Sequence, residues 1–162
     1  MSLASVREFL AENAPDVVIV ELGRASSTRT LSAQWNIAPA QIAKTLALKV
    51  GDRSLLLVAC GDSRLDRKKI KSELGGSPRM LPPEEVTALT GHPVGGVCPF
   101  GLATRLPVYF DVRLKVYDEV VPAAGSTHSA LRINPLRMAE LVGGAWVDVC
   151  DGPDEQRRSS GQ

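Results

Sequence analysis

Two apolar runs on either side of a short polar turn constrain the fold of this chain more than any other feature of its sequence. TLALKV (residues 45–50) and SLLLVAC (residues 54–60) flank Gly-Asp-Arg at 51–53. Strand-forming runs separated by a short turn that contains glycine are typical of a β-hairpin. The sequence therefore predicts a pair of antiparallel strands over residues 45–60.

Helices and strands alternate irregularly around this hairpin. Apolar spacing, capping residues and prolines predict helices over 2–13, from the caps Ser26, Ser27 and Thr28 through Leu31 and Trp35, and over 39–43, 66–74, 82–89 and 135–141. Short apolar runs predict strands over 17–22, 108–112, 117–121, 129–133 and 146–150. We therefore expect one compact α/β domain, with helices packed on a mixed sheet, rather than a regular doubly wound fold.

The length and composition fit one domain with an aliphatic core. The 162 residues match the usual size of a single domain, which we place at residues 1–150. Aromatic residues make up only 4% of the sequence, so the core must consist mainly of Val, Leu, Ile and Ala. The last stretch, DGPDEQRRSSGQ (151–162), is polar and lacks an apolar period, which predicts a disordered tail.

The charge and the apolar runs narrow the class of protein. A formal net charge of +1 argues against bulk electrostatic capture of nucleic acid, but it leaves room for a local basic patch. No run is long enough to span a bilayer, and no basic and apolar leader opens the chain. We therefore expect a cytoplasmic protein that does not act at a membrane.

The cysteines predict neither a disulfide framework nor a metal site. Cys60, Cys98 and Cys150 are odd in number and widely spaced, without a Cys-x-x-Cys pair. With His92 and His128 they lack the close-paired spacing of zinc ligands, so we expect no metal. Cys60 and Cys150 each end an apolar run, and we interpret both as small core residues.

The stretch GHPVGGVCPFG (91–101) is a candidate functional loop. Its four glycines and two prolines exclude a helix or a central strand, and its apolar residues predict a semi-rigid, partly buried loop. The successive amides of residues 95–98 can converge on an anion or a developing oxyanion, whereas Pro99 has no amide hydrogen to donate. A tight structural turn explains the glycines equally well.

Two cationic features stand out. Lys44 lies in QIAKTLALKV among apolar neighbours that indicate partial burial, and lysine is rarely buried without a partner or a task. A lysine whose stem follows the surface is the simpler alternative. RLDRKKIK (64–71) spaces its cations so that a helix would carry them as one stripe able to follow phosphates, although a solvated helix face is the commoner explanation. These cations are Arg64, Arg67, Lys68 and Lys71.

GSTH (125–128) puts a glycine, hydroxyl groups and an imidazole beside a predicted strand. His128 could act as an acid, a base or a hydrogen-bond donor, but a lone histidine is more often structural. Cys98 with His92 or His128 could form a thiol nucleophile and its base, although no local signature supports this pair. The chain has neither a Gly-x-Ser-x-Gly elbow nor a Gly-Lys-Ser/Thr phosphate loop.

The order of these motifs resembles one known family. IAKTL, a hairpin, a cationic helix, TGHPVGGVCPFG, VYFDV and GSTHSALRI follow one another as in the YbaK-like editing domains associated with prolyl-tRNA synthetase. The resemblance covers roughly residues 1–150, and its most specific parts are Lys44 in QIAKTL and the Gly-x-x-x-Pro loop from Gly95 to Pro99. Cys98 stands where the family has a small, often hydroxylated residue, so we interpret it as a loop residue and not as a nucleophile.

This resemblance implies a compact α/β domain with a strongly curved mixed sheet. It also implies an enzyme that hydrolyses misacylated tRNA, usually tRNA(Pro), without a cofactor and without DNA as a partner. A chain of this length would be a freestanding, trans-acting editor to which prolyl-tRNA synthetase or an elongation factor supplies the tRNA. The expected catalytic residues are Lys44, Gly95, Gly96, Val97 and Cys98. The expected substrate contacts are Lys44, His92, Pro99, Phe100, Gly125, Ser126 and His128, and the stripe Arg64, Arg67, Lys68 and Lys71 would contact the tRNA.

In the expected reaction, water attacks the ester between the amino acid and the terminal ribose. The amides of residues 95–98 stabilise the oxyanion, and Lys44 positions the terminal nucleotide. If the amino acid is cysteine, its own thiol could attack instead. A small pocket selects by steric fit, which leaves alanine, cysteine, serine, threonine or a non-protein amino acid open. A binding module that kept the fold without the chemistry, and a regulatory partner protein, are the alternatives.

Overall fold

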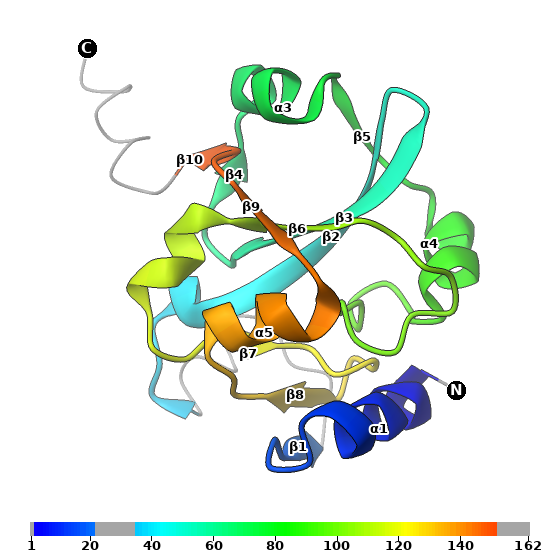
Figure 1. Cartoon of the computed structure of the whole chain (residues 1–162), viewed down its shortest axis with the longest axis vertical. Coiled ribbons are helices and arrows are strands. Elements are labelled where there is room, and N and C mark those ends of the chain that lie inside the picture. Colours follow the sequence, from blue (N-terminus) through cyan, green and yellow to red (C-terminus); the bar gives the residue numbers. More distant parts are fainter. Residues whose placement is uncertain (1, 22–34, 152–162) are drawn as a thin grey trace.

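The computed structural model describes residues 2–21 and 35–151 (Figure 1). The predicted helix that begins at Ser26–Thr28 and the predicted tail from residue 152 lie outside the described residues. Asp151, which the sequence assigns to that tail, is instead the last residue of a short strand. None of the helices within the described ranges is long and apolar enough to cross a membrane.

A mixed sheet forms the centre of the molecule, as the irregular order of elements predicts (Figure 1). The predicted hairpin is confirmed: β2 (Ile42–Val50) and β3 (Arg53–Cys60) pair antiparallel along their whole length. β5 (Pro78–Met80) adds an antiparallel edge strand to β2. β6 (Val108–Asp111) and β9 (Ala145–Val147) continue the sheet in parallel beyond β3.

Three shorter pairings close the fold around this sheet. β7 (Val121–Pro122) runs parallel to the start of β2. β1 (Ile19–Glu21) and β8 (Ser129–Leu131) form a separate antiparallel pair. β4 (Arg64–Leu65) and β10 (Cys150–Asp151) form another.

Capping residues begin and end the helices close to the predicted positions. Asp66 caps its helix by accepting hydrogen bonds from the amides of Lys68 and Lys69, and Gly75 ends it in the left-handed region at φ 85°. Asn134 caps the last helix in the same way. The helices that lie wholly within the described ranges are α1 (Ser2–Asn13), α3 (Arg67–Leu74), α4 (Pro83–Thr90), α5 (Pro135–Val142) and two 3₁₀ helices, η1 (Pro39–Gln41) and η2 (Val112–Val116).

Several predicted elements change length or type. The helix predicted over 39–43 is a single 3₁₀ turn, because Ile42 already pairs with β7. The strands predicted over 117–121 and 129–133 are reduced to β7 at 121–122 and β8 at 129–131, and beyond these strands Val120 and Ile133 form an isolated bridge. The strand predicted over 146–150 breaks into β9 and β10. The sequence did not predict η2, β4 or β5.

Both faces of β3 are buried, which explains its continuous apolar run. Side chains alternate between the faces, so two clusters form. The first cluster includes Ala43, Ala47, Leu56, Val58, Cys60, Phe100, Phe110 and Met138. The second cluster includes Leu48, Leu55, Leu57, Ala59, Ile70, Leu74 and Cys150. Cys60 and Cys150 are buried free thiols, as predicted.

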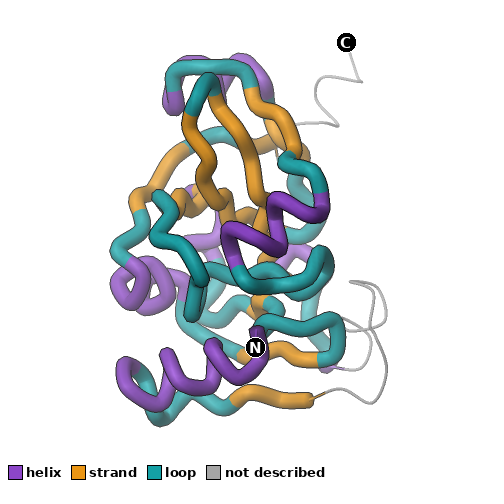
Figure 2. Tube along the Cα trace, turned by 90° about the vertical axis from the view of Figure 1, so that its right-hand side faces the viewer, coloured by secondary structure: helices purple, strands orange, loops and turns teal. Residues whose placement is uncertain are grey.

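The molecule is elongated, and its two ends carry different elements. α3 and the turn between β2 and β3 lie at one end of the long axis, whereas α1 and the β1–β8 pair lie at the other (Figures 1 and 2). Figure 2, turned by a quarter rotation about this axis, keeps the same separation.

Candidate functional site

The loop at 91–101, called the glycine loop below, connects α4 to β6 and is held by its own backbone. Gly91 ends α4 in the left-handed region at φ 76°, and the amide of Gly96 donates to the carbonyl of Pro93 over 2.9 Å. Residues 96–100 are buried, while Pro93, Val94 and Gly95 are exposed. A semi-rigid, partly buried loop is therefore what the structure contains.

His92 braces this loop from inside and has no exposed surface. Its Nε2 lies 2.8 Å from the carbonyl oxygen of Phe100, and its amide donates to Thr90 Oγ1 over 3.0 Å. Burial lowers the pKa of His92, and the hydrogen bond to Phe100 offsets part of that decrease. The lowered pKa favours the neutral imidazole. The sequence expected a substrate contact here, but a fully buried ring joined to the loop's own carbonyl instead holds the loop's shape.

Cys98 and Phe100 also point inward. The Cys98 sulfur is completely buried, 3.7 Å from His92 Nε2 and 3.8 Å from the Phe100 carbonyl oxygen. Burial raises the pKa of the Cys98 thiol to about 12, so a thiolate does not form near neutral pH. The Phe100 ring is buried in the first cluster, with its centroid 5.9 Å from that of Phe9. The geometry thus disfavours a thiol nucleophile, and it makes Phe100 a core anchor rather than an exposed substrate contact.

The glycine loop and the GSTH segment meet backbone to backbone. The Gly125 amide donates to the Gly96 carbonyl over 3.0 Å. A Cβ at Gly96 would lie 2.7 Å from main-chain atoms of Ser126, and one at Gly95, where φ is +93°, would lie 3.1 Å from Thr127 Cγ2. Only glycine fits such an approach at position 96. The structure therefore brings together two motifs that the sequence placed in one site.

The hydroxyl groups of GSTH organise its own turn. Ser126 Oγ lies 2.6 Å from Ser129 Oγ and accepts a hydrogen bond from the His128 amide over 3.2 Å. The His128 side chain is exposed. Ser126 thus lies beside the glycine loop, and a contact of the exposed His128 side chain with a substrate stays a prediction.

The main-chain donors of the glycine loop are not equivalent. The sequence predicted that the Gly96 amide is available to a ligand, but it already donates to the carbonyl of Pro93. Within residues 2–21 and 35–151, the amides of Gly95, Val97 and Cys98 donate to no other group. Because buried amides are nearly always paired in proteins, Val97 and Cys98 are the stronger candidates for binding an oxygen anion.

Lys44 leaves β2 on the opposite side from the buried part of the glycine loop. Its Nζ donates to the carbonyl of Ser63, in the turn after β3. Burial raises the pKa of the Cys150 thiol, and the charge of Lys44 offsets part of that increase. Strand alternation places the Lys44 side chain on the face of Leu48 in the second cluster, whereas Val97 belongs to the first cluster. Convergence of Lys44 with the glycine loop stays a prediction.

Two hydroxyl groups near Lys44 escaped the sequence reasoning. Thr45 points to the other face of β2, and its Oγ1 is buried without a hydrogen-bond partner among the described residues. Ser63 Oγ is buried in the same condition. Nothing in the sequence marks Ser63, but Thr45 follows Lys44 directly and could have been included on adjacency alone.

The prediction that the cations of residues 64–71 share one helix face is wrong. Arg64 belongs to β4, opposite Asp151, and Asp66 starts α3 only afterwards. Arg67, Lys68 and Lys71 are exposed on α3. The helix begins late because the Asp66 side chain takes the first amides, so the four cations do not share one helical spacing.

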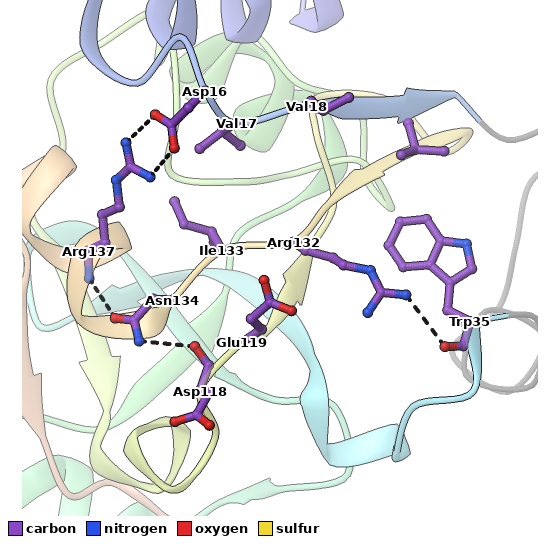
Figure 3. Close-up of a pocket in the computed structure, with 11 residues that line it drawn as sticks. Asp16, Val17, Val18, Trp35, Asp118, Glu119, Arg132, Ile133, Asn134 and Arg137 are labelled. Atoms are coloured by element: carbon purple, nitrogen blue, oxygen red, sulfur yellow. Dashed lines mark hydrogen bonds and ion pairs between the residues drawn. The ribbon is translucent and has the colours of Figure 1, made fainter.

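A pocket of about 720 Å³ lies on another part of the surface (Figure 3). Arg137 closes one wall through a two-pronged ion pair with Asp16, at 2.7 and 2.5 Å, and holds the pKa of Asp16 down at about 2. On the other side the Arg132 guanidinium stacks on Trp35, 4.8 Å from the ring centroid. No residue of the expected site lines this pocket. Separate segments supply its walls, so no local motif in the sequence predicts it.

The pocket offers acidic and basic groups to a ligand but, among the described residues that line it, no hydroxyl, thiol or amine nucleophile. Its walls combine valines with the carboxylates of Asp118 and Glu119 and the two arginines (Figure 3). It contains no cysteine, serine, histidine or lysine among its lining residues. The glycine loop with GSTH therefore remains the better candidate for chemistry. No group of three or more His, Cys, Asp or Glu side chains suited to a metal ion occurs in the described part of the chain.

Comparison with known proteins assigns most of the chain to one family. Residues 24–141 match the family model "Aminoacyl-tRNA editing domain". The uncharacterized protein YwhH of Bacillus subtilis is 40% identical over 153 residues, 93% of this chain and 98% of that protein. The "Putative Cys-tRNA(Pro)/Cys-tRNA(Cys) deacylase EbsC" of Enterococcus faecalis is 26% identical over 126 residues, 76% of each. The solved "putative trans-editing enzyme for prolyl tRNA synthetase" superposes with a TM-score of 0.86 at 31% identity, covering 93% of this chain and 98% of that chain.

Proposed function

The chain belongs to the aminoacyl-tRNA editing domain family, and we propose that it is a trans-acting deacylase of misacylated tRNA. Its substrate is the ester between a small, wrongly attached amino acid and the terminal ribose. tRNA(Pro) is the first candidate, because the names of the deacylase and of the trans-editing enzyme described above both refer to proline decoding. Prolyl-tRNA synthetase is the corresponding candidate for the protein that supplies the tRNA.

The observation that carries this proposal is the backbone contact between the glycine loop and GSTH. The Gly125–Gly96 hydrogen bond and the close approach of Gly96 to Ser126 fix the loop's main chain. The Cys98 and Phe100 side chains point inward and anchor the loop, so at these positions a main-chain amide, rather than the side chain, is the group proposed to meet a substrate. Fixed main-chain donors are what stabilisation of a developing oxyanion requires.

The chemistry needs few other groups because an aminoacyl ester is already activated. A water oxygen forms a bond to the acyl carbon, and the carbonyl oxygen becomes an oxyanion held by the Val97 and Cys98 amides. The bond from that carbon to the ribose oxygen then breaks, and the proton lost by water goes to the ribose oxygen. A single such donor contributes ~10²–10³ in rate in well-studied hydrolases.

The Lys44 side chain leaves β2 on the face opposite Val97, so we place its charge on the terminal nucleotide rather than on the reacting ester. Among the described residues its ammonium is held by the neutral carbonyl of Ser63 and not by a carboxylate, so its charge is uncompensated. An ammonium in that state can exchange one carbonyl for a phosphate of the terminal nucleotide. We assign it the role of positioning the 3′ end rather than that of an acid or a base.

Deacylation assays test the proposal directly. Ala-, Cys-, Ser- and Thr-tRNA(Pro) are incubated with the protein, with correctly charged Pro-tRNA(Pro) as the control, and ester loss is followed over time. We expect hydrolysis of at least one mischarged species well above the rate in buffer, with Pro-tRNA(Pro) spared. Hydrolysis of none of them would contradict the proposal for tRNA(Pro), and survival of a wider aminoacyl-tRNA panel would contradict deacylation altogether.

Lys44→Met removes the charge but keeps an aliphatic stem of similar length. We expect it to lower the deacylation rate by about tenfold or more, on the scale of one lost electrostatic contact. Lys115→Met is the matched control, because Lys115 is exposed on η2 and stacks on Trp146 at 4.6 Å. Equal rates for the two variants would remove Lys44 from the mechanism. A wild-type protein that binds aminoacyl-tRNA tightly without hydrolysing it would favour the alternative of a binding module.

A further inference from the structure

The pocket in Figure 3 contains charged side chains that the fold leaves unpaired, and none of its described lining residues belongs to the proposed deacylase site. Asp118 and Glu119 are exposed, and within the described ranges neither carboxylate makes a hydrogen bond or an ion pair. Their main chain, in contrast, is held. Asn134 Nδ2 donates to the Asp118 carbonyl over 3.0 Å, and Gln41 Nε2 donates to the Glu119 carbonyl over 3.4 Å. Two free carboxylates therefore border the pocket on a fixed segment.

Arg132 carries the opposite charge on a facing segment of the same pocket. The bridge between Val120 and Ile133 makes Glu119 and Arg132 diagonal neighbours on one face, within the reach of long side chains. They form no ion pair with each other, because the Arg132 guanidinium lies over the Trp35 ring, 4.8 Å from its centroid, and donates to the Trp35 carbonyl over 3.5 Å. In the part of the chain that the structure describes, Arg132 has no carboxylate partner, so the pocket keeps charges of opposite sign apart.

The other walls of the pocket are apolar or already neutralised. Val18 and Val20 are 71% and 40% exposed, and apolar side chains that are exposed together are a common feature of binding sites. Asp16 and Arg137 neutralise each other through their two-pronged ion pair. The volume of about 720 Å³ lies in the range of pockets that enclose small organic molecules. The pocket thus offers an apolar surface beside free groups of opposite charge.

From these observations we propose that this pocket binds a small zwitterion, either a free amino acid or a short peptide. Asp118 and Glu119 hold its ammonium group, Arg132 holds its carboxylate, and the two valines pack against its apolar part. Both ligands share this chemistry, and the experiment below separates them. The inference goes beyond deacylation and does not rest on it, because no described lining residue belongs to the glycine loop, GSTH or Lys44.

A zwitterion matches the pocket better than an ion of one sign. Arg132 repels a ligand that carries only positive charge, and the two carboxylates repel a ligand that carries only negative charge. A zwitterion satisfies both groups, and hydrogen bonds between ionised groups are stronger than those between neutral ones. Because Trp35 keeps Arg132 away from Glu119, no internal ion pair has to break before the ligand binds.

Calorimetric titration with leucine, leucyl-leucine and their blocked forms tests the proposed chemistry. The C-terminal amides lack the carboxylate, and the N-acetyl forms lack the ammonium group. We expect saturable binding of at least one zwitterion, and binding of its blocked forms that is weaker by about tenfold or more, because each has lost one ionic hydrogen-bonding group.

The two zwitterions distinguish the sources of the ligand. Tighter binding of leucyl-leucine identifies a peptide site, and leucine that binds at least as tightly identifies an amino-acid site. Saturable binding of neither zwitterion, or equal binding of a blocked form, overturns the proposal.

Isosteric variants assign each ligand charge to its partner. Arg132→Gln should bind the zwitterion and its amide equally, since the carboxylate has lost its partner. Asp118→Asn with Glu119→Gln should remove the preference for the zwitterion over its N-acetyl form. These side chains are exposed, so both proteins should keep the wild-type urea midpoint for unfolding. A loss by the same factor for every probe would indicate a structural role and overturn the assignment.

Two exposed sets of residues outside the pocket supply matched controls. Arg105→Gln repeats the loss of one arginine, and Glu84→Gln with Glu85→Gln repeats the loss of two adjacent carboxylates, at the start of α4. Both control proteins should bind the zwitterion within about twofold of the wild type, because distant exposed charges are screened by salt. An equal loss in the control and pocket variants overturns the proposal.

Two further variants locate the bound ligand. The chain has two tryptophans, so in a Trp146→Phe protein the emission of Trp35 alone is measured, and it should change with the same saturation as the heat. Lys44→Met should bind the zwitterion as the wild type does. Unchanged Trp35 emission, or loss of binding in Lys44→Met but not in Arg132→Gln, places the ligand elsewhere and overturns the proposal. None of these measurements needs hydrolysis, so they decide on the pocket even if the deacylation assay fails.

Discussion

Replacing Gly96 by alanine tests the contact on which the candidate site depends. An added Cβ would lie 2.7 Å from the N, Cα and C atoms of Ser126, whereas ordinary contacts begin at 3.4 Å. The two main chains must therefore separate by about 0.7 Å or more. Because all three atoms belong to backbone, no side-chain rotation can relieve the clash.

The size of the effect follows from two terms. Overpacking of a close contact costs about 1–3 kcal/mol of unfolding free energy. Separation of the chains also weakens the hydrogen bond from Gly125 to Gly96, which contributes about 0.5–1.5 kcal/mol. We expect Gly96→Ala to lower the unfolding free energy by about 2–4 kcal/mol. Displaced loop amides should lower the deacylation rate by up to ~10²-fold in the molecules that remain folded.

Gly51→Ala is the matched control. Gly51 lies in the hairpin turn with φ +61°, and a Cβ there would meet nothing within 4 Å. Its cost is the left-handed backbone alone, about 1–2 kcal/mol, with no effect on the glycine loop. Both variants are compared with the wild type by urea unfolding and by the initial rate of deacylation. If Gly96→Ala loses no more stability than Gly51→Ala and keeps full activity, the close approach does not shape the site.

Two further predictions concern titratable side chains. Cys98→Ala should keep the deacylation rate within about threefold, because it keeps the main-chain amide. The wild-type Cys98 should react with a thiol reagent only after unfolding, since burial raises the pKa of its thiol to about 12. Loss of activity in the variant, or fast reaction of the native protein with the reagent, would contradict these expectations. Arg137→Ala should raise the pKa of Asp16 from about 2 towards the ordinary value of 3.8 for this side chain, as measured by carboxyl NMR. Because the pKa of Asp16 is lower in the folded than in the unfolded state, the pair's contribution to folding stability is present above pH 3.8 and is lost as the pH falls towards 2. The effect on stability should be small, since both side chains are exposed. An unchanged titration of Asp16 in the variant would refute the pairing.

Elements whose signals are local could be predicted from the sequence. The hairpin needs only two apolar runs and a turn, and α3 needs only Asp66 and Gly75, which supply its cap and its end. The stripe failed on the same local chemistry: Asp66, inside the stripe, is a better helix start than Arg64. Elements that depend on distant partners could not be predicted. The last strand breaks where the buried Asp111 carboxylate accepts the amides of Val149 and Cys150, 38 and 39 residues away.

The candidate site divides in the same way. The contact between the glycine loop and GSTH depends on glycines that are visible in the sequence, but glycine freedom does not say which segments meet, and only the family resemblance placed the two in one site. The direction of the Lys44 side chain depends on strand register, which decides the face that each residue occupies. Its bond to Ser63 and its side of β2 therefore follow from pairing that a single sequence does not reveal.

The orientation of the glycine loop has a consequence for specificity. The side chains of Cys98, Phe100 and His92 point inward and hold the loop, and the proposed mechanism therefore uses main-chain amides of this loop. Amides bind an oxyanion whichever acyl group it belongs to, so this loop cannot by itself distinguish alanine from serine or cysteine. Discrimination must then come from side chains that border the loop from other elements. Of the described GSTH residues, Ser126 lies against Gly96 and Thr127 against Gly95, so these are the positions where substitution should change the amino acid removed rather than the rate of its removal.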